Sequence, residues 1–135
     1  ERLDLTGKEK FEETGKAVCE KRGWSLAANQ IDVPTEGSRK QIVYFNFFNY
    51  ESREMVKLHT VIGSTARIRP ERLIFALELN FRLPHGCLAV NKENLVMVDT
   101  LILEEVDSVE LESAVDFLAK TGDKYEAALF ARDEH

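Results

Sequence analysis

The sequence predicts an α+β fold, an antiparallel five-stranded sheet with three helices in the order α-β-β-β-α-β-β-α. Three observations predict it. Apolar residues recur at three- and four-residue spacing near the start, in the middle and at the end of the chain. Between these stretches lie short runs rich in β-branched and aromatic residues, separated by turn residues. The 135 residues, 44% of them hydrophobic, suffice for one core, so we expect a single domain over 1–135.

The first half of the chain is predicted to form one helix and a meander of three strands. The helix spans 8–22, because Gly23 follows a basic last turn as a C-terminal glycine does. One strand is expected within 24–33, before Pro34, a second over 41–49 and a third over 55–63. In the second strand, both faces carry apolar side chains, so either face could pack against the helices.

The second half is predicted to form a helix, a hairpin and a long closing helix. Pro70 opens the helix over 70–81, which is apolar almost all round and therefore expected to be buried on more than one side. Strands follow over 87–90 and 95–103. The last helix runs from Ser108, its expected N-cap, to about residue 132, and Gly122 indicates a bend or a close approach within it.

Composition and charge exclude several classes of function. The net charge of −6 opposes a phosphate backbone and disfavours nucleic-acid binding. No apolar run reaches the length of a membrane span, so we expect no membrane partner and a cytoplasmic location. Cys19 and Cys87 form no CxxC pair and are expected to be reduced, mostly buried thiols. Ligand-spaced clusters are missing from the sequence, so neither a metal nor a cofactor is expected.

Few residues are candidates for catalysis or anion binding. The bases available at neutral pH are His59, His85 and His135. His85 precedes Cys87 by two positions, which leaves a Cys-His nucleophile open as an alternative, although a turn at this point disfavours it. No catalytic residue is therefore assigned. Three arginines before and within the start of the second helix form a weak candidate anion site that exposure alone also explains: Arg67, Arg69 and Arg72.

The element order and several local segments resemble the type III secretion chaperones of bacteria, a fold that includes the Tir chaperone and YbjN-like proteins. The matching segments are Leu77-Glu78-Leu79-Asn80, Gly86-Cys87-Leu88-Ala89-Val90, Leu95-Val96-Met97-Val98, Leu101-Ile102-Leu103, 109–111 and the helix over 117–129. The resemblance implies a small acidic cytoplasmic homodimer without enzymatic activity. In the secretion chaperones, a disordered segment of a client protein binds along the surface.

Two surfaces are candidates for these interactions. The excess of apolar residues in the second helix predicts a dimer interface formed by Ile74, Leu77, Glu78 and Phe81. The apolar strands predict a client-binding surface formed by Val43, Phe45, Phe47, Met55 and Val61.

The sequence thus predicts a non-enzymatic protein-binding domain that binds an extended segment of a client, such as a secreted effector, as a homodimer. One alternative is a YbjN-like regulatory or structural domain that acts through folded partners. A second is a small cysteine-dependent enzyme that uses His85 and Cys87.

Overall fold

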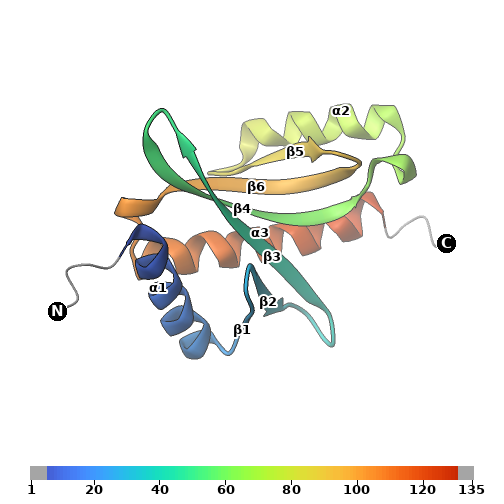
Figure 1. Cartoon of the computed structure of the whole chain (residues 1–135). Coiled ribbons are helices and arrows are strands. Elements are labelled where there is room, and N and C mark those ends of the chain that lie inside the picture. Colours follow the sequence, from blue (N-terminus) through green and yellow to red (C-terminus); the bar gives the residue numbers. More distant parts are fainter. Residues whose placement is uncertain (1–5, 131–135) are drawn as a thin grey trace.

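The computed structural model describes residues 6–130, in which three α-helices pack against one six-stranded antiparallel sheet (Figure 1). The strand order is β1-β2-β3-β4-β6-β5. The strands are β1 (Ser25–Leu26), β2 (Gln30–Pro34), β3 (Lys40–Tyr50), β4 (Arg53–Ser64), β5 (Cys87–Asn91) and β6 (Asn94–Ile102). The helices are α1 (Gly7–Arg22), α2 (Pro70–Leu79) and α3 (Ser108–Leu129), with 3₁₀ turns at η2 (Thr65–Arg67), η3 (Asn80–Arg82) and η4 (Leu103–Glu105). The predicted α+β class and antiparallel sheet are confirmed.

The prediction of five strands is wrong because the segment 24–33 forms two strands. The chain reverses after Leu26, and the Ala27 N–H donates to the Gln30 carbonyl at 2.9 Å to close the turn. Leu26 then lies opposite Ile31 across a two-residue pairing. A run of mixed polarity does not distinguish one short strand from a tight hairpin, because both contain the same residues.

The helix ends follow local capping chemistry. Thr6 and Glu9 form a reciprocal capping box at the start of α1, and Gly23 ends this helix with φ +74° in the left-handed region. Pro70 occupies the first turn of α2 as predicted. The N-cap of α3 is Asp107, whose side chain accepts from the Glu110 N–H, and not Ser108 as predicted. Residue 132, the predicted end of the last helix, lies outside the described residues.

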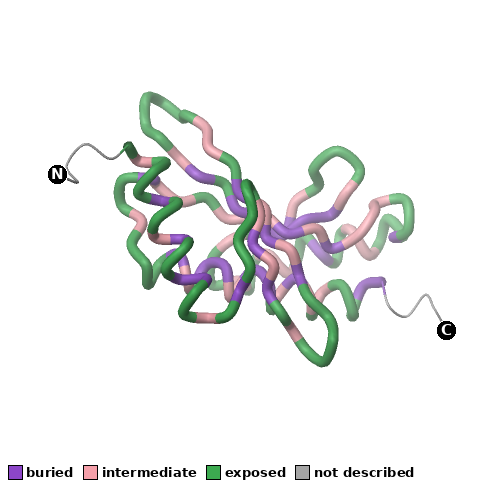
Figure 2. The backbone as a smooth tube through the Cα atoms, turned by 60° about the horizontal axis from the view of Figure 1, so that its bottom comes forward, coloured by how far each residue is buried: buried purple, intermediate pink, exposed green. Residues whose placement is uncertain are grey.

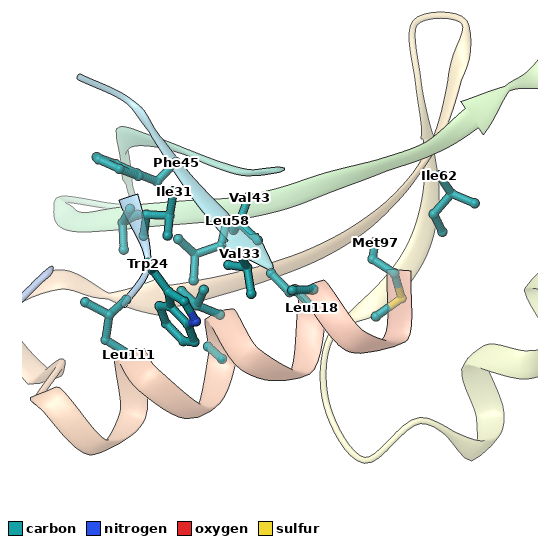
Figure 3. Close-up of a cluster of buried hydrophobic side chains, with 14 of the residues drawn as sticks. Trp24, Ile31, Val33, Val43, Phe45, Leu58, Ile62, Met97, Leu111 and Leu118 are labelled. Carbon is teal, nitrogen blue, oxygen red and sulfur yellow. The ribbon is translucent and has the colours of Figure 1, made fainter. Parts of the chain in front are cut away.

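The core lies between the sheet and α1 and α3, as Figure 3 shows for the residues around Trp24 and Leu118. Strand β3 contributes Val43 and Phe45 to it, and β4 contributes Val56 and Leu58. Figure 2 shows buried positions gathered where the strands meet the helices, whereas loops and hairpin tips are exposed. The structure therefore decides which face of β3 points inward, a choice that the two-faced apolar pattern left open.

Strands β3 and β4 separate at one end of their pairing. The pairing starts at Tyr44 and His59, so the first residues of β3 pair only with β2 and the last residues of β4 only with β6. The Gln41 amide fills the fork: it donates to Thr60 Oγ1 and to the Val61 carbonyl, both at 3.0 Å. Gly122 of α3 packs against this point, where a Cβ would lie 2.7 Å from Thr60 Cγ2. The predicted close approach at Gly122 is confirmed.

Both edges of the sheet offer little backbone for pairing. At the β5 edge, the Asn80 side chain accepts from the Leu88 N–H at 2.6 Å and donates to the Leu88 carbonyl at 3.1 Å. At the other edge, β1 is only two residues long. Short edge strands and edges covered by side chains are common protections against unwanted strand addition. Asn80 therefore bonds the edge of β5.

Helices α1 and α3 are joined by Arg22. Its guanidinium donates to Glu112 at 2.7 Å and to Asp116 at 2.9 Å, and it lies 4.6 Å from the centre of the Trp24 ring. These hydrogen bonds, the Glu112 bond first, raise the pKa of Arg22 and keep it charged. Among residues 6–130, no helix is long and apolar enough to cross a lipid bilayer.

Candidate protein-binding surfaces

The outer side of α2 and of the following turn η3 carries an exposed apolar stripe, formed by Ile74, Leu77 and Phe81 and called here the α2 stripe. Ile74 and Leu77 are more than half exposed, and Phe81 is 96% exposed. On the inner side, Ala76 is buried and Leu73 is half-buried. Burying an apolar side chain of this size contributes about 1.5–3 kcal/mol, so an exposed stripe indicates a surface suited to a partner.

Beside the α2 stripe lies an apolar hollow of about 200 Å³ between α2 and the sheet edge. Its walls carry almost exclusively apolar surface. We call it the α2–β5 hollow, and it is lined by Leu73, Ala76, Leu77, Leu88, Ala89, Val90 and Leu95. Val90 at its rim is more than half exposed. The stripe and the hollow form one continuous surface, because Leu77 belongs to both.

All four residues of the predicted dimer interface are exposed: Ile74, Leu77, Glu78 and Phe81. The prediction that the helix is buried on more than one side does not hold within one chain, since Ala76 is its one fully buried residue among those described. A second chain would have to supply any further burial.

The predicted client surface is divided by the structure. Val43 and Phe45 are 0% and 3% exposed and belong to the core, so the prediction that they form an open surface is wrong. Their face of β3 is the one that α1 and α3 cover. Phe47 and Met55 are half-buried and line a small depression beside Lys8, whereas Val61 lies near the β3–β4 fork. The five residues therefore do not form one patch.

A larger groove, which sequence reasoning missed, lies between α1 and the β1–β2 hairpin. Its volume is about 690 Å³. We call it the α1 groove, and it is lined by Glu9, Phe11, Glu12, Glu13, Gly15, Lys16, Leu26, Ala27, Ala28, Ile31 and Phe45. Figure 1 shows α1 beside the β1–β2 hairpin, and α1 contacts β1. The turn at Ala27 and Ala28, which separates β1 from β2, forms one wall of the groove. A prediction of two strands within 24–33 would have indicated this groove.

The α1 groove combines an apolar floor with an acidic rim. Phe11, Ile31 and Phe45 are buried beneath it, and small residues at 27 and 28 leave it open. Glu9 and Glu12 on α1 are exposed along one side, where Lys16 is the one basic residue among the lining residues named. Such a groove favours apolar side chains accompanied by positive charge.

The candidate Cys-His pair is not assembled in the structure. The His85 ring contacts the Phe117 ring in a tilted arrangement, with ring centres 4.4 Å apart, and its Nδ1 lies 3.5 Å from Asp99 Oδ2. Cys87 is exposed, contrary to the expectation of burial, and makes no hydrogen bond with His85 within residues 6–130. Cys19 is buried as expected, and this burial raises the pKa of its thiol.

The remaining histidines contribute no cluster. His59 is half-buried and stacks on Tyr44 at 5.3 Å between ring centres. Burial lowers its pKa, and the charge of Lys57 lowers it further. His135 lies outside the described residues. Within 6–130, no group of three or more His, Cys, Asp or Glu side chains is placed to hold a metal ion.

Two arginines of the weak anion site have partners inside the chain. Arg72 donates to the Ala128 carbonyl in the last turn of α3 at 3.1 Å, and Arg67 lies over the Phe130 ring at 5.6 Å. A cation near a helix C-terminus is favoured by the helix dipole. These contacts connect α2 and its preceding turn to the end of α3, which is a structural role.

No protein-family model matches the chain, and no curated protein is significantly similar to it in sequence.

Proposed function

We propose that this chain is a non-enzymatic protein-binding domain that acts as a homodimer and binds an extended segment of a client protein. The proposal joins the resemblance of the chain to type III secretion chaperones with two surfaces of the structure. The α1 groove is the client site, and the α2 stripe is the dimer surface.

One observation carries the proposal, namely the open α1 groove, which has an apolar floor and a rim with more acidic than basic side chains. Its floor residues already belong to the core, so the groove is formed before any ligand arrives. Preformed sites avoid part of the ordering cost of binding. A folded partner would meet the exposed α1 side chains first, whereas a single extended strand can reach the floor at Phe11 and Phe45.

The chemistry of the groove defines the client. Apolar side chains would enter between α1 and the small residues Ala27 and Ala28. Basic side chains would lie along Glu9 and Glu12, where unlike charges speed association and select the direction of the chain. Since the sheet edges at β1 and at Leu88 are blunted, we propose that side-chain contacts contribute more of the affinity than added strand pairing.

The proposal is tested by selecting binders from a displayed library of unstructured peptides. We expect enrichment of peptides with two or more large apolar residues and at least one Lys or Arg. The exposed Ala27 is then replaced in Ala27→Trp, which fills the groove and should weaken the selected peptides at least 10-fold, roughly the loss of one good contact. The matched control is Glu20→Ala, which changes an exposed α1 residue outside the groove.

The outcomes separate the candidate functions. Peptides that bind the Ala27→Trp variant as tightly as the unchanged protein would refute the groove as the site. Failure to select any peptide, together with isolation of folded partner proteins only, would favour a YbjN-like domain acting through folded partners. Alkylation of Cys87 faster than free cysteine at neutral pH would support the cysteine-dependent enzyme instead.

A further inference from the structure

Phe81 is the most exposed large apolar side chain within residues 6–130. It belongs to the 3₁₀ turn η3 (Asn80–Arg82), which continues directly from α2. The turn is held in place, because Asn80 makes two hydrogen bonds to Leu88. Phe81 is therefore an aromatic side chain presented to solvent on a fixed backbone, which is a costly arrangement unless something covers it.

The α2–β5 hollow provides a matching space on the same surface. Its volume is about 200 Å³, and its walls are aliphatic. An apolar cavity of about 150 Å³ is large enough to bind benzene, so the hollow can accept a phenyl ring. Phe81 does not fill the hollow of its own chain, because it is almost fully exposed.

We propose that two copies of this chain pair about a twofold axis so that Phe81 of each copy inserts into the α2–β5 hollow of the other. This inference rests on the homodimer of the proposed function and specifies the contacts that hold it. In a twofold interface the same surface serves both copies, so a protruding group and a recess beside each other are used twice. The Leu77 side chains, which lie between the two features, meet near the axis.

Charge favours an antiparallel pair of α2 helices, which is the arrangement that a twofold axis perpendicular to the helices produces. Glu71 lies in the first turn of α2, and Arg82 ends the following 3₁₀ turn. Both are exposed. An antiparallel pair brings Glu71 of one copy towards Arg82 of the other at both ends, whereas a parallel pair would place like charges together.

The sheet edge gives a second reason for pairing through side chains. A dimer that continued the sheet across two β5 strands would need the backbone of Leu88, which Asn80 already occupies. The two copies therefore meet through α2 and the hollow. The partner on this surface is a second copy of the chain and not an added strand.

The test uses two variants that remove opposite halves of the same contact. Phe81→Ala removes the inserted ring but keeps the hollow. Val90→Trp blocks the exposed rim of the hollow but keeps Phe81, and tryptophan is well tolerated in strands. We expect each variant to weaken dimerisation roughly 100-fold or more, because each homodimer loses two central aromatic contacts. Val109→Ala, an exposed apolar position on α3, is the matched control and should leave the dimer unchanged.

A mixture of the two variants makes the test specific. In the mixed dimer, Phe81 of the Val90→Trp chain still faces the open hollow of the Phe81→Ala chain, so one of the two contacts survives. Sedimentation of the mixture should therefore show heterodimers at least 10-fold tighter than either variant alone, roughly the value of one such contact. Circular dichroism confirms that both variants are folded.

Three other outcomes would refute either the homodimer or the insertion of Phe81. A mass near 15.4 kDa for the unchanged protein at micromolar concentration would refute the homodimer, and with it this inference, while leaving peptide binding to the α1 groove as a separate result. Dimers unaffected by either substitution would refute the insertion of Phe81 but keep the homodimer. Folded monomeric variants that fail to form heterodimers would also refute insertion.

Discussion

The two ends of the molecule use their apolar residues in opposite ways. Where α1 and α3 meet the sheet, apolar side chains are covered and charged groups outside join the helices, as Arg22 does with Glu112 and Asp116. At the α2–β5 end, Ile74, Leu77 and Phe81 face solvent. The difference shows that an apolar helix can serve the fold or a partner, and that burial and not composition separates the two.

Two matched leucine substitutions should show the largest difference between the two ends. Leu118→Ala, in the buried face of α3, should lower the free energy of unfolding by about 2–5 kcal/mol because it leaves a cavity. Leu77→Ala, on the α2 stripe, should change the stability of the monomer by less than about 0.5 kcal/mol. Urea unfolding at several protein concentrations separates monomer stability from dimer loss. Equal effects of the two substitutions would show that the two ends do not differ in how their apolar residues are used.

Removing the arginine that joins α1 and α3 tests what the charged contacts add at the covered end. Arg22→Ala should lower the free energy of unfolding by about 1–2 kcal/mol, since it removes two charge-assisted hydrogen bonds and a contact with Trp24 that is only partly screened by water. Hydrogen exchange should show the loss of protection concentrated in α1. Lys16→Ala, an exposed position on the same helix, is the control. Protection lost first in α2 would argue against this division of the molecule.

The β3–β4 hairpin is shared by both ends and can be stabilised at its tip. Glu51 and Ser52 both have positive φ, +49° and +72°, although neither is the residue that such a turn prefers. Glu51→Asn combined with Ser52→Gly should raise the free energy of unfolding by about 0.5–1 kcal/mol. The midpoint of urea unfolding measures it. A stabilisation confined to one end in hydrogen exchange would show that the two ends unfold separately.

Acid should weaken the covered end in a modest way. Hydrogen bonds from Arg22 and Lys21 lower the pKa of Glu112, and those from Lys40 and Gln30 lower the pKa of Asp32. A carboxyl group whose pKa is lowered by folding stabilises the fold above its unfolded pKa, and loses this contribution as the pH falls through the folded value. The urea concentration at the midpoint of unfolding should therefore decrease once the pH drops below about 4.5, the ordinary range of carboxyl pKa values. The decrease of the urea midpoint with falling pH should be shallower in Arg22→Ala. An equal decrease in this variant would show that the Arg22–Glu112 hydrogen bond is not its cause.

Much of the fold is predictable from local patterns in this sequence. The C-terminal end of α1 and the start of α2 follow from Gly23 and Pro70, residues whose backbone preferences act without tertiary context. The antiparallel meander from β2 to β4 follows from alternation and short turns. These features need only neighbouring residues, which the sequence contains.

Features that depend on distant residues were harder to predict. Both faces of β3 are apolar, so only the positions of α1 and α3 decide that Val43 and Phe45 are buried. The α1 groove required the hairpin turn at Ala27, and the bonds of Asn80 required a strand eight residues away. The exposed α2 stripe was predictable from the number of apolar residues in the helix. An apolar helix at a sheet edge has more apolar surface than one chain can cover.

The fork between β3 and β4 has a consequence for how this sequence can vary. Gln41, Thr60 and Gly122 come from three distant parts of the chain, yet they occupy one buried point where a side chain at position 122 would collide with Thr60. A larger residue at 122 therefore demands a smaller one at 60, and losing the Gln41 amide would leave the Val61 carbonyl without that donor. Substitutions at these three positions should be tolerated in combination and rejected singly, so the three positions should covary in any lineage that keeps this fold.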